Sequence, residues 1–260
     1  MVGAGAVENA WQPVIRALQP GFTDPLDGDG AYCALARSVY LARFYATWKG
    51  SEAEEKKAWA AKYLNEIKQS IATALRADQK AGLLRTRKEL LAILHKFIFS
   101  EIHQSVLISA NWDTVVDQEI NRLGESNYPK PGSDIKTLHI HGSIDEPTGL
   151  YLPSEVVREA YRTEEEDLAM GNLHGSIWQT IEQCHICVVY GLSLDPLDAE
   201  LSQTLVAGWS NPNLQEVIII NPSHEKVANR AKFMLDERYP AKITGYHPAA
   251  LDKPVIYKMP

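Results

Sequence analysis

Short apolar runs rich in β-branched residues, each separated from the next by a helix-forming segment, constrain the fold of this chain most strongly. Val217–Ile220 and Ile186–Tyr190 are the clearest runs, Val106–Ser109 and Thr137–Ile140 are shorter, and Lys242–Tyr246 is the weakest. Short strands without polar alternation are typical of a parallel sheet covered on both faces. We therefore predict an α/β fold, a Rossmann-like doubly wound parallel sheet.

A helical block interrupts this alternation. Residues 31–104 are rich in alanine and long side chains and contain no strand signal, whereas residues 7–18 before them have apolar residues at helical spacing. We therefore predict an α/β domain made of residues 1–23 and 104–260, with residues 24–103 as an inserted helical module of the same unit. Further helices are predicted over 113–123, 154–161, 167–184, 198–209 and 223–238.

Charge and cysteine content exclude several classes of protein. The net charge is −7, and an acidic surface repels phosphate backbones, so we expect no direct nucleic-acid binding. No run of 18 apolar residues occurs, so no membrane-spanning helix is expected. Only three cysteines are present, and the chain opens without a secretion signal, which favours a reducing cytoplasm.

Polar clusters follow each predicted strand at its carboxyl end, where open parallel sheets bind their ligands. The five clusters are Gly3-Ala4-Gly5, Ser109-Ala110-Asn111-Trp112-Asp113, His141-Gly142-Ser143, Gly191-Leu192-Ser193 and Asn221-Pro222-Ser223. The carboxyl ends of parallel strands share one edge, so we expect the five clusters to lie on one rim. The first cluster, a turn before a helix, would offer backbone N–H groups to a phosphate.

The order of these clusters resembles the sirtuin-like family, specifically its bacterial branch of NAD-consuming antiphage-defence proteins. The resemblance covers residues 1–23 and about 104–225. It implies NAD as substrate, bound between the sheet rim and the helical module, and an NAD glycohydrolase activity that releases nicotinamide and ADP-ribose. It also implies that Asn111 and His141 are the catalytic residues.

The resemblance further implies which residues bind the substrate. Asp113 matches an aspartate that contacts the nicotinamide amide. Ser193, preceded by Gly191, matches a serine near the ribose and phosphates, and Asn221 matches an asparagine near the adenosine ribose. Gly3, Ala4 and Gly5 would form the phosphate-binding turn.

These residue types suit the chemistry. Breaking an N-glycosidic bond to a pyridinium builds oxocarbenium character on the ribose, and the leaving group departs neutral, so no strong acid is required. The Asn111 amide can orient the ribose and the attacking water. An imidazole has an unperturbed pKa of about 6.5 and so can accept a proton near neutral pH, and His141 supplies such a group.

Each assignment also has a purely structural interpretation. Asn111 or Asp113 can cap the helix that follows, and His141 can be a turn residue, with His139 as a competing base. The remaining clusters can be ordinary local structure: a tight turn at Gly3–Gly5, a helix cap at Ser193 and a strand-ending turn at Asn221. Both interpretations stay open from the sequence.

Two other functions remain: a sensor that binds NAD or an ADP-ribose derivative without cleaving it, and a deacylase or ADP-ribosyltransferase. Sirtuin deacylases carry two Cys-x-x-Cys pairs for zinc, whereas this chain has one, Cys184 and Cys187. In a strand these two face opposite sides, so we expect core packing and no metal. Recognition in such systems often uses another subunit, so we expect a homo-oligomer or a sensor partner protein.

Overall fold

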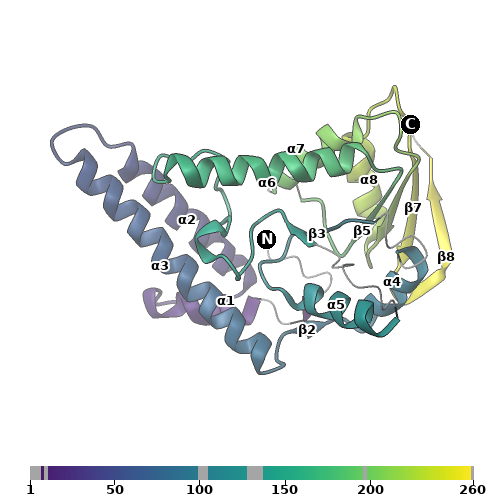
Figure 1. Ribbon diagram of the computed structural model, residues 1–260, viewed down its shortest axis with the longest axis horizontal. Helices are drawn as coiled ribbons and strands as arrows, with labels where there is room; N and C mark the ends of the chain where they lie inside the picture. Colours follow the sequence, from purple (N-terminus) through teal and green to yellow (C-terminus); the bar gives the residue numbers. More distant parts are fainter. Residues whose placement is uncertain (1–6, 9–10, 99–104, 128–136, 196–197, 259–260) are drawn as a thin grey trace.

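The computed structural model describes residues 7–8, 11–98, 105–127, 137–195 and 198–258. They form a mixed α/β structure with helices in the N-terminal part and sheets in which parallel pairing predominates. In Figure 1 the helices α2 and α3 stand at one end of the molecule and the strands β5–β8 at the other. No helix among the described residues is long and apolar enough to cross a membrane.

The N-terminal part is helical with one small exception. Its helices are α1 (Trp11–Leu18), the 3-10 turn η1 (Gln19–Gly21), α2 (Gly28–Ala46), α3 (Ala53–Lys80) and α4 (Leu90–Phe97). The exception is an antiparallel pair, β1 (Val7–Glu8) with β2 (Arg85–Thr86). This pair corrects two predictions: the first helix begins four residues later than residue 7, and the 31–104 block contains a strand.

The strands predicted after residue 104 are confirmed. They are β3 (Leu107–Ser109), β4 (Thr137–His139), β5 (Ile186–Tyr190), β6 (Glu216–Ile220) and β7 (Lys242–His247). β3 pairs with β4, and β5–β6–β7 form a second parallel set. The sequence analysis missed β8 (Ala250–Tyr257), which adds antiparallel to β7. The described residues form three separate sheets and not the one doubly wound sheet that was predicted. The α/β class itself is confirmed, because helices and parallel strands are both present.

Strand β6, in the interior of the larger sheet, is buried on both faces, as its apolar run predicts. Val217 and Ile219 belong to the core formed with α7 (Ala199–Trp209) and α8 (His224–Met234). Ile218 and Ile220 cluster instead with Ile93 of α4. Successive side chains of a strand point to opposite faces, so one uninterrupted run serves two cores.

Helices α5 (Val115–Asn127) and α6 (Glu164–Glu182) follow β3 and β4, and a 3-10 turn, η3 (Pro147–Gly149), lies between β4 and α6. A capping box formed by Thr163 and Glu166 starts α6. The helix predicted over 154–161 is wrong. Two glutamates fold back on the backbone there, since Glu155 accepts from Leu152 N at 2.6 Å and Glu159 from Val156 N at 2.8 Å. These contacts favour turns over a helix.

Candidate functional site

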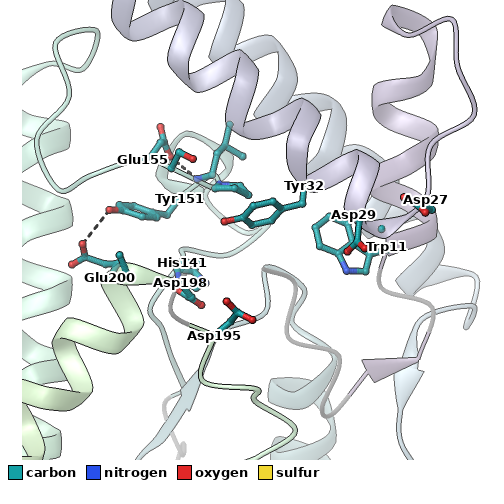
Figure 2. Close-up of a pocket in the computed structure, with 15 residues that line it drawn as sticks. Trp11, Asp27, Asp29, Tyr32, His141, Tyr151, Glu155, Asp195, Asp198 and Glu200 are labelled. Atoms are coloured by element: carbon teal, nitrogen blue, oxygen red, sulfur yellow. Dashed lines mark hydrogen bonds and ion pairs between the residues drawn. The ribbon is translucent and has the colours of Figure 1, made fainter. Parts of the chain in front are cut away.

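A cavity of about 470 Å³ lies between the N-terminal helices and the segments that follow β4 and β5. This volume is within the usual range of small-molecule sites, roughly 300–1,000 Å³. Its lining comes from three stretches of chain: Trp11, Asp27, Gly28, Asp29 and Tyr32; then His141 and Tyr151–Glu155; then Asp195 and Asp198–Glu200. Figure 2 shows these side chains around one space.

A glycine turn places His141 on the cavity wall. Gly142 has a φ of +71°, and a Cβ added there would collide with the Gly149 carbonyl. Gly142 N donates to His139 O at 3.0 Å, which closes the turn directly after β4. Only glycine fits this position, so the His-Gly pair ends the strand and turns the imidazole toward the cavity.

The His141 ring is held between two acceptors. Its Nδ1 lies 3.2 Å from the Ala110 carbonyl oxygen, which can only accept, so Nδ1 carries the hydrogen. Nε2 lies 3.3 Å from Asp198 Oδ1. Burial alone would raise the pKa of Asp198, but the contact with His141 outweighs it and leaves that pKa below its ordinary value. Asp198 is therefore ionised at neutral pH.

His174 and Glu200 form a second histidine–carboxylate pair, and Glu200 also lines the cavity. His174 Nε2 donates to the Ile140 carbonyl at 2.8 Å, and Nδ1 lies 2.9 Å from Glu200 Oε1. This contact with His174 lowers the pKa of Glu200. Tyr151 donates to Glu200 Oε2 at 3.2 Å, and its ring lies 6.0 Å from that of His141. Both carboxylates flank the start of α7, where the helix dipole favours negative charge.

Asn111 lies beside His141 along the sheet edge but not on the cavity wall. The two follow the neighbouring strands β3 and β4, and Ala110, which receives the His141 hydrogen bond, directly precedes Asn111. The Asn111 residue is 4% exposed, and its carbonyl accepts from His139 Nδ1 at 2.9 Å. His139 also pairs with Asp117 at 3.1 Å and does not line the cavity.

Asp113 is buried close to the start of α5. Its Oδ1 accepts from Val115 N, two residues along, at 3.1 Å, which forms an Asx turn just before α5; Thr114, whose carbonyl accepts from Gln118 N, occupies the N-cap position. Its Oδ2 is buried and has no hydrogen-bond partner among the described residues. Burial raises the pKa of this carboxyl group. Asp113 does not line the cavity either.

The remaining predicted binding residues that the structure describes form hydrogen bonds within the protein, near the ends of β5 and β6. Asn221 Nδ2 donates to the Leu192 carbonyl at 3.0 Å, while its Oδ1 accepts from Ser223 N at 2.8 Å. The Ser193 carbonyl accepts from Arg230 Nη1 at 2.7 Å. Asp198, and not Ser193, caps α7. Gly191 (φ +68°), Ser193 and Asn221 lie off the cavity wall, and Gly3, Ala4 and Gly5 lie outside the described residues.

Sequence reasoning missed most of the cavity wall. Asp195 and Asp198 follow the Gly191–Ser193 cluster directly, so their position after β5 was a signal that could have been used. Tyr32 and Trp11 gave no such signal, because they reach the cavity only when the helices pack against the sheet.

The cysteine pair packs against the core of the larger sheet, as predicted, but the two thiols do not face opposite sides. β5 begins at Ile186, so Cys184 lies in the turn before the strand and its thiol contacts that of Cys187. This contact lowers the pKa of Cys184 and raises that of Cys187. Within the described ranges, no group of three or more His, Cys, Asp or Glu side chains is arranged to hold a metal ion.

Comparisons with known proteins do not assign this cavity. No family model matches the chain, and no match was found among curated proteins or solved structures. The functional argument therefore rests on the cavity and on the residues at the strand ends.

Proposed function

We propose that this protein is an NAD glycohydrolase with a sirtuin-like, Rossmann-like architecture, which cleaves NAD to nicotinamide and ADP-ribose. One observation carries the proposal. His141 lines a 470 Å³ cavity at the carboxyl ends of two parallel strands, and Asn111 follows the neighbouring strand at the same edge. An amide and an imidazole at one sheet edge are the pair that this chemistry requires.

The carboxylates of the cavity support the same reaction. When the bond to nicotinamide breaks, positive charge moves from the pyridinium ring to the ribose. Asp198 and Glu200, both with a lowered pKa, are ionised and favour that charge. Opposite the ionised Asp198 the His141 Nε2 carries a proton, so the base is the neutral ring: once that proton has left to solvent, a ribose hydroxyl or a water that takes the place of Asp198 would give up its own proton to Nε2.

Asp113 supports the placement of the nicotinamide. Its buried Oδ2 has no hydrogen-bond partner among the described residues, and a buried oxygen in that state costs free energy. A carboxamide N–H of the substrate would satisfy it. Asp113 does not line the cavity, so in this proposal the carboxamide of nicotinamide would have to reach past the cavity wall to that oxygen, while the ring stays in the cavity and Asn111 and His141 act at the ribose.

The test measures nicotinamide release from NAD by purified protein, for the wild type and for Asn111→Ala and His141→Ala. We expect each substitution to lower turnover by about 100-fold or more. His185→Ala is the matched control, because His185 is exposed before β5 and does not line the cavity. Equal turnover in all four proteins would contradict the proposal.

The second candidate is a sensor that binds NAD, or an ADP-ribose derivative, without cleaving it. Two observations favour it: Asp198 already faces His141 Nε2, and Asn111 does not line the cavity. Calorimetry decides between the two. Tight binding of intact NAD, with no nicotinamide released in any assembly state, would select the sensor.

We further propose a role in bacterial antiphage defence, with self-assembly or a separate sensor protein as the trigger. Exposed aromatic residues support a protein interface at the joined ends of α2 and α3. Trp48 and Trp59 are 43% and 46% exposed there, and Phe44 is 49% exposed. By contrast, Trp112 and Trp209 are core residues.

A further inference from the structure

The cavity has an unusual charge. None of its described lining residues is lysine or arginine, whereas each of the three stretches that line it contributes carboxylates. These carboxylates belong to Asp27, Asp29, Asp195, Asp198 and Glu200, with Glu155 as a sixth acidic residue of the lining. A cavity whose side chains bind phosphate groups would instead have more basic than acidic residues in its lining.

The basic side chains that pair with some of these carboxylates do not themselves line the cavity. The Glu155 carboxylate is fully buried and pairs with Lys68 at 3.1 Å and Arg162 at 2.9 Å. Asp195 is 3.6 Å from Arg230, which is not a lining residue. Asp29 forms no ion pair with any described residue. A molecule inside the cavity is therefore closer to carboxylates than to the side chains of lysine or arginine.

Three aromatic side chains also line the cavity. Trp11 and Tyr32 come from the helical side and Tyr151 from the opposite side. In Figure 2 the Tyr32 ring projects from α2 toward Tyr151. Aromatic faces attract cations through the negative face of the ring, and flat walls suit a flat ligand. Acidic and aromatic groups together select an organic cation with a planar body.

We propose that this cavity binds a positively charged pyridinium ring and selects it over an uncharged ring of the same shape. The inference rests on the proposed function, because the oxidised nicotinamide of NAD is such a ring. The reaction itself already requires the oxidised ring; the inference adds that the cavity selects this ring by its charge when it binds, before any bond breaks. The reduced dinucleotide, whose ring is neutral, should bind more weakly, and the phosphates of the substrate must lie outside the carboxylate-lined part.

The test uses two small probes that contain no ribosyl bond, so neither can be turned over. Calorimetry measures the binding of 1-methylnicotinamide, a cation, and of nicotinamide, its neutral counterpart. We expect the cation to bind at least about tenfold more tightly. The preference should shrink as salt is added, because ions screen charges in an open cavity.

Two substitutions locate the effect. Asp29→Asn removes a carboxylate that has no ion-pair partner among the described residues, and Tyr32→Leu removes an aromatic face. Each should reduce the preference for the cation severalfold and change nicotinamide binding little. Asp252→Asn is the matched control, since Asp252 is exposed on β8 and does not line the cavity. Circular dichroism establishes that each variant is folded.

Equal affinity for the two probes, tighter binding of nicotinamide, or no measurable binding of either at millimolar concentration would overturn the inference. An unchanged preference in both cavity variants would overturn it as well. These results are separate from the proposed function. A protein that prefers the cation but never releases nicotinamide from NAD contradicts the hydrolase alone, whereas one that hydrolyses NAD without the preference contradicts the charge selection alone.

Discussion

Two histidines at the end of β4, separated by one residue, have different surroundings. His141 faces the cavity and Asp198, whereas His139 donates to the Asn111 carbonyl and pairs with Asp117 on α5. Of the two, only His141 is followed directly by a glycine, Gly142. The structure places His141 on the cavity wall and His139 off it. The adjacent glycine was therefore the informative signal at this scale.

The His139–Asp117 pair predicts a pH-dependent stability. Burial alone disfavours the charged imidazole, but the contacts with Asp117 and the Asn111 carbonyl outweigh burial and raise the pKa of His139. The stabilisation is therefore complete below the unfolded pKa of about 6.5 and is lost as the pH rises through the folded value. Asp117→Asn should lower the free energy of unfolding by about 1 kcal/mol at low pH and by less at high pH.

Denaturant unfolding of wild type and variant at about pH 5.5 and about pH 8.5 checks this dependence. A loss of stability that is the same at both pH values, or larger at high pH, would show that the charged pair does not form.

At the scale of elements, strands were easier to predict than the segments between them. The β-branched run in β6 fixes a strand on local grounds alone, and its position was confirmed. The 154–161 segment had helical spacing but folds as turns, because Glu155 and Glu159 bind nearby backbone N–H groups and more distant cations. Such long-range partners leave no local pattern in a sequence.

The turn after β4 predicts a large effect of a small substitution. Gly142→Ala places a Cβ at positive φ and against the Gly149 carbonyl, which should cost about 3 kcal/mol of unfolding free energy or more. Gly175→Ala is the control. Gly175 lies within α6, and a Cβ there meets no atom within 4 Å, so alanine should stabilise by about 0.5–1 kcal/mol.

Thermal and denaturant unfolding of both alanine variants measures the contrast. Similar stabilities for the two variants would mean that the turn relaxes without cost, and that His141 is not held by it.

At the scale of the whole molecule, the cavity is the part that sequence reasoning could not reach. The position of His141 after a predicted strand was enough to place it at the ligand-binding edge, because the carboxyl ends of parallel strands share one edge of the sheet. The opposite wall consists of Trp11, Tyr32 and the start of α2, and these residues meet the rim only through the packing of the helices on residues 112–161. No spacing within the chain encodes that contact.

A buried ionic cluster joins the two sides. Lys68 of α3 pairs with Glu155 beside the cavity, and Arg162 pairs with the same carboxylate. Lys68→Met would leave Glu155 with one cation instead of two and should cost about 2–4 kcal/mol. Lys62→Met is the control on the same helix, because Lys62 is 78% exposed and 3.9 Å from Glu66, so its loss should cost less than about 0.5 kcal/mol.

Chemical denaturation of the two methionine variants, followed by tryptophan fluorescence, provides the measurement. If Lys68→Met were as stable as Lys62→Met, the buried cluster would contribute nothing to the attachment of α3.

The division of the cavity between distant stretches of chain separates two properties that evolution can then alter independently. His141, Asp198 and Glu200 belong to the sheet side, whereas Trp11, Asp29 and Tyr32 belong to the helical side. A descendant that exchanged α2 and α3 for other helices would keep His141 and its carboxylate partners but present a different opposite wall to ligands. Ligand choice can therefore diversify in this architecture while the reactive half stays unchanged.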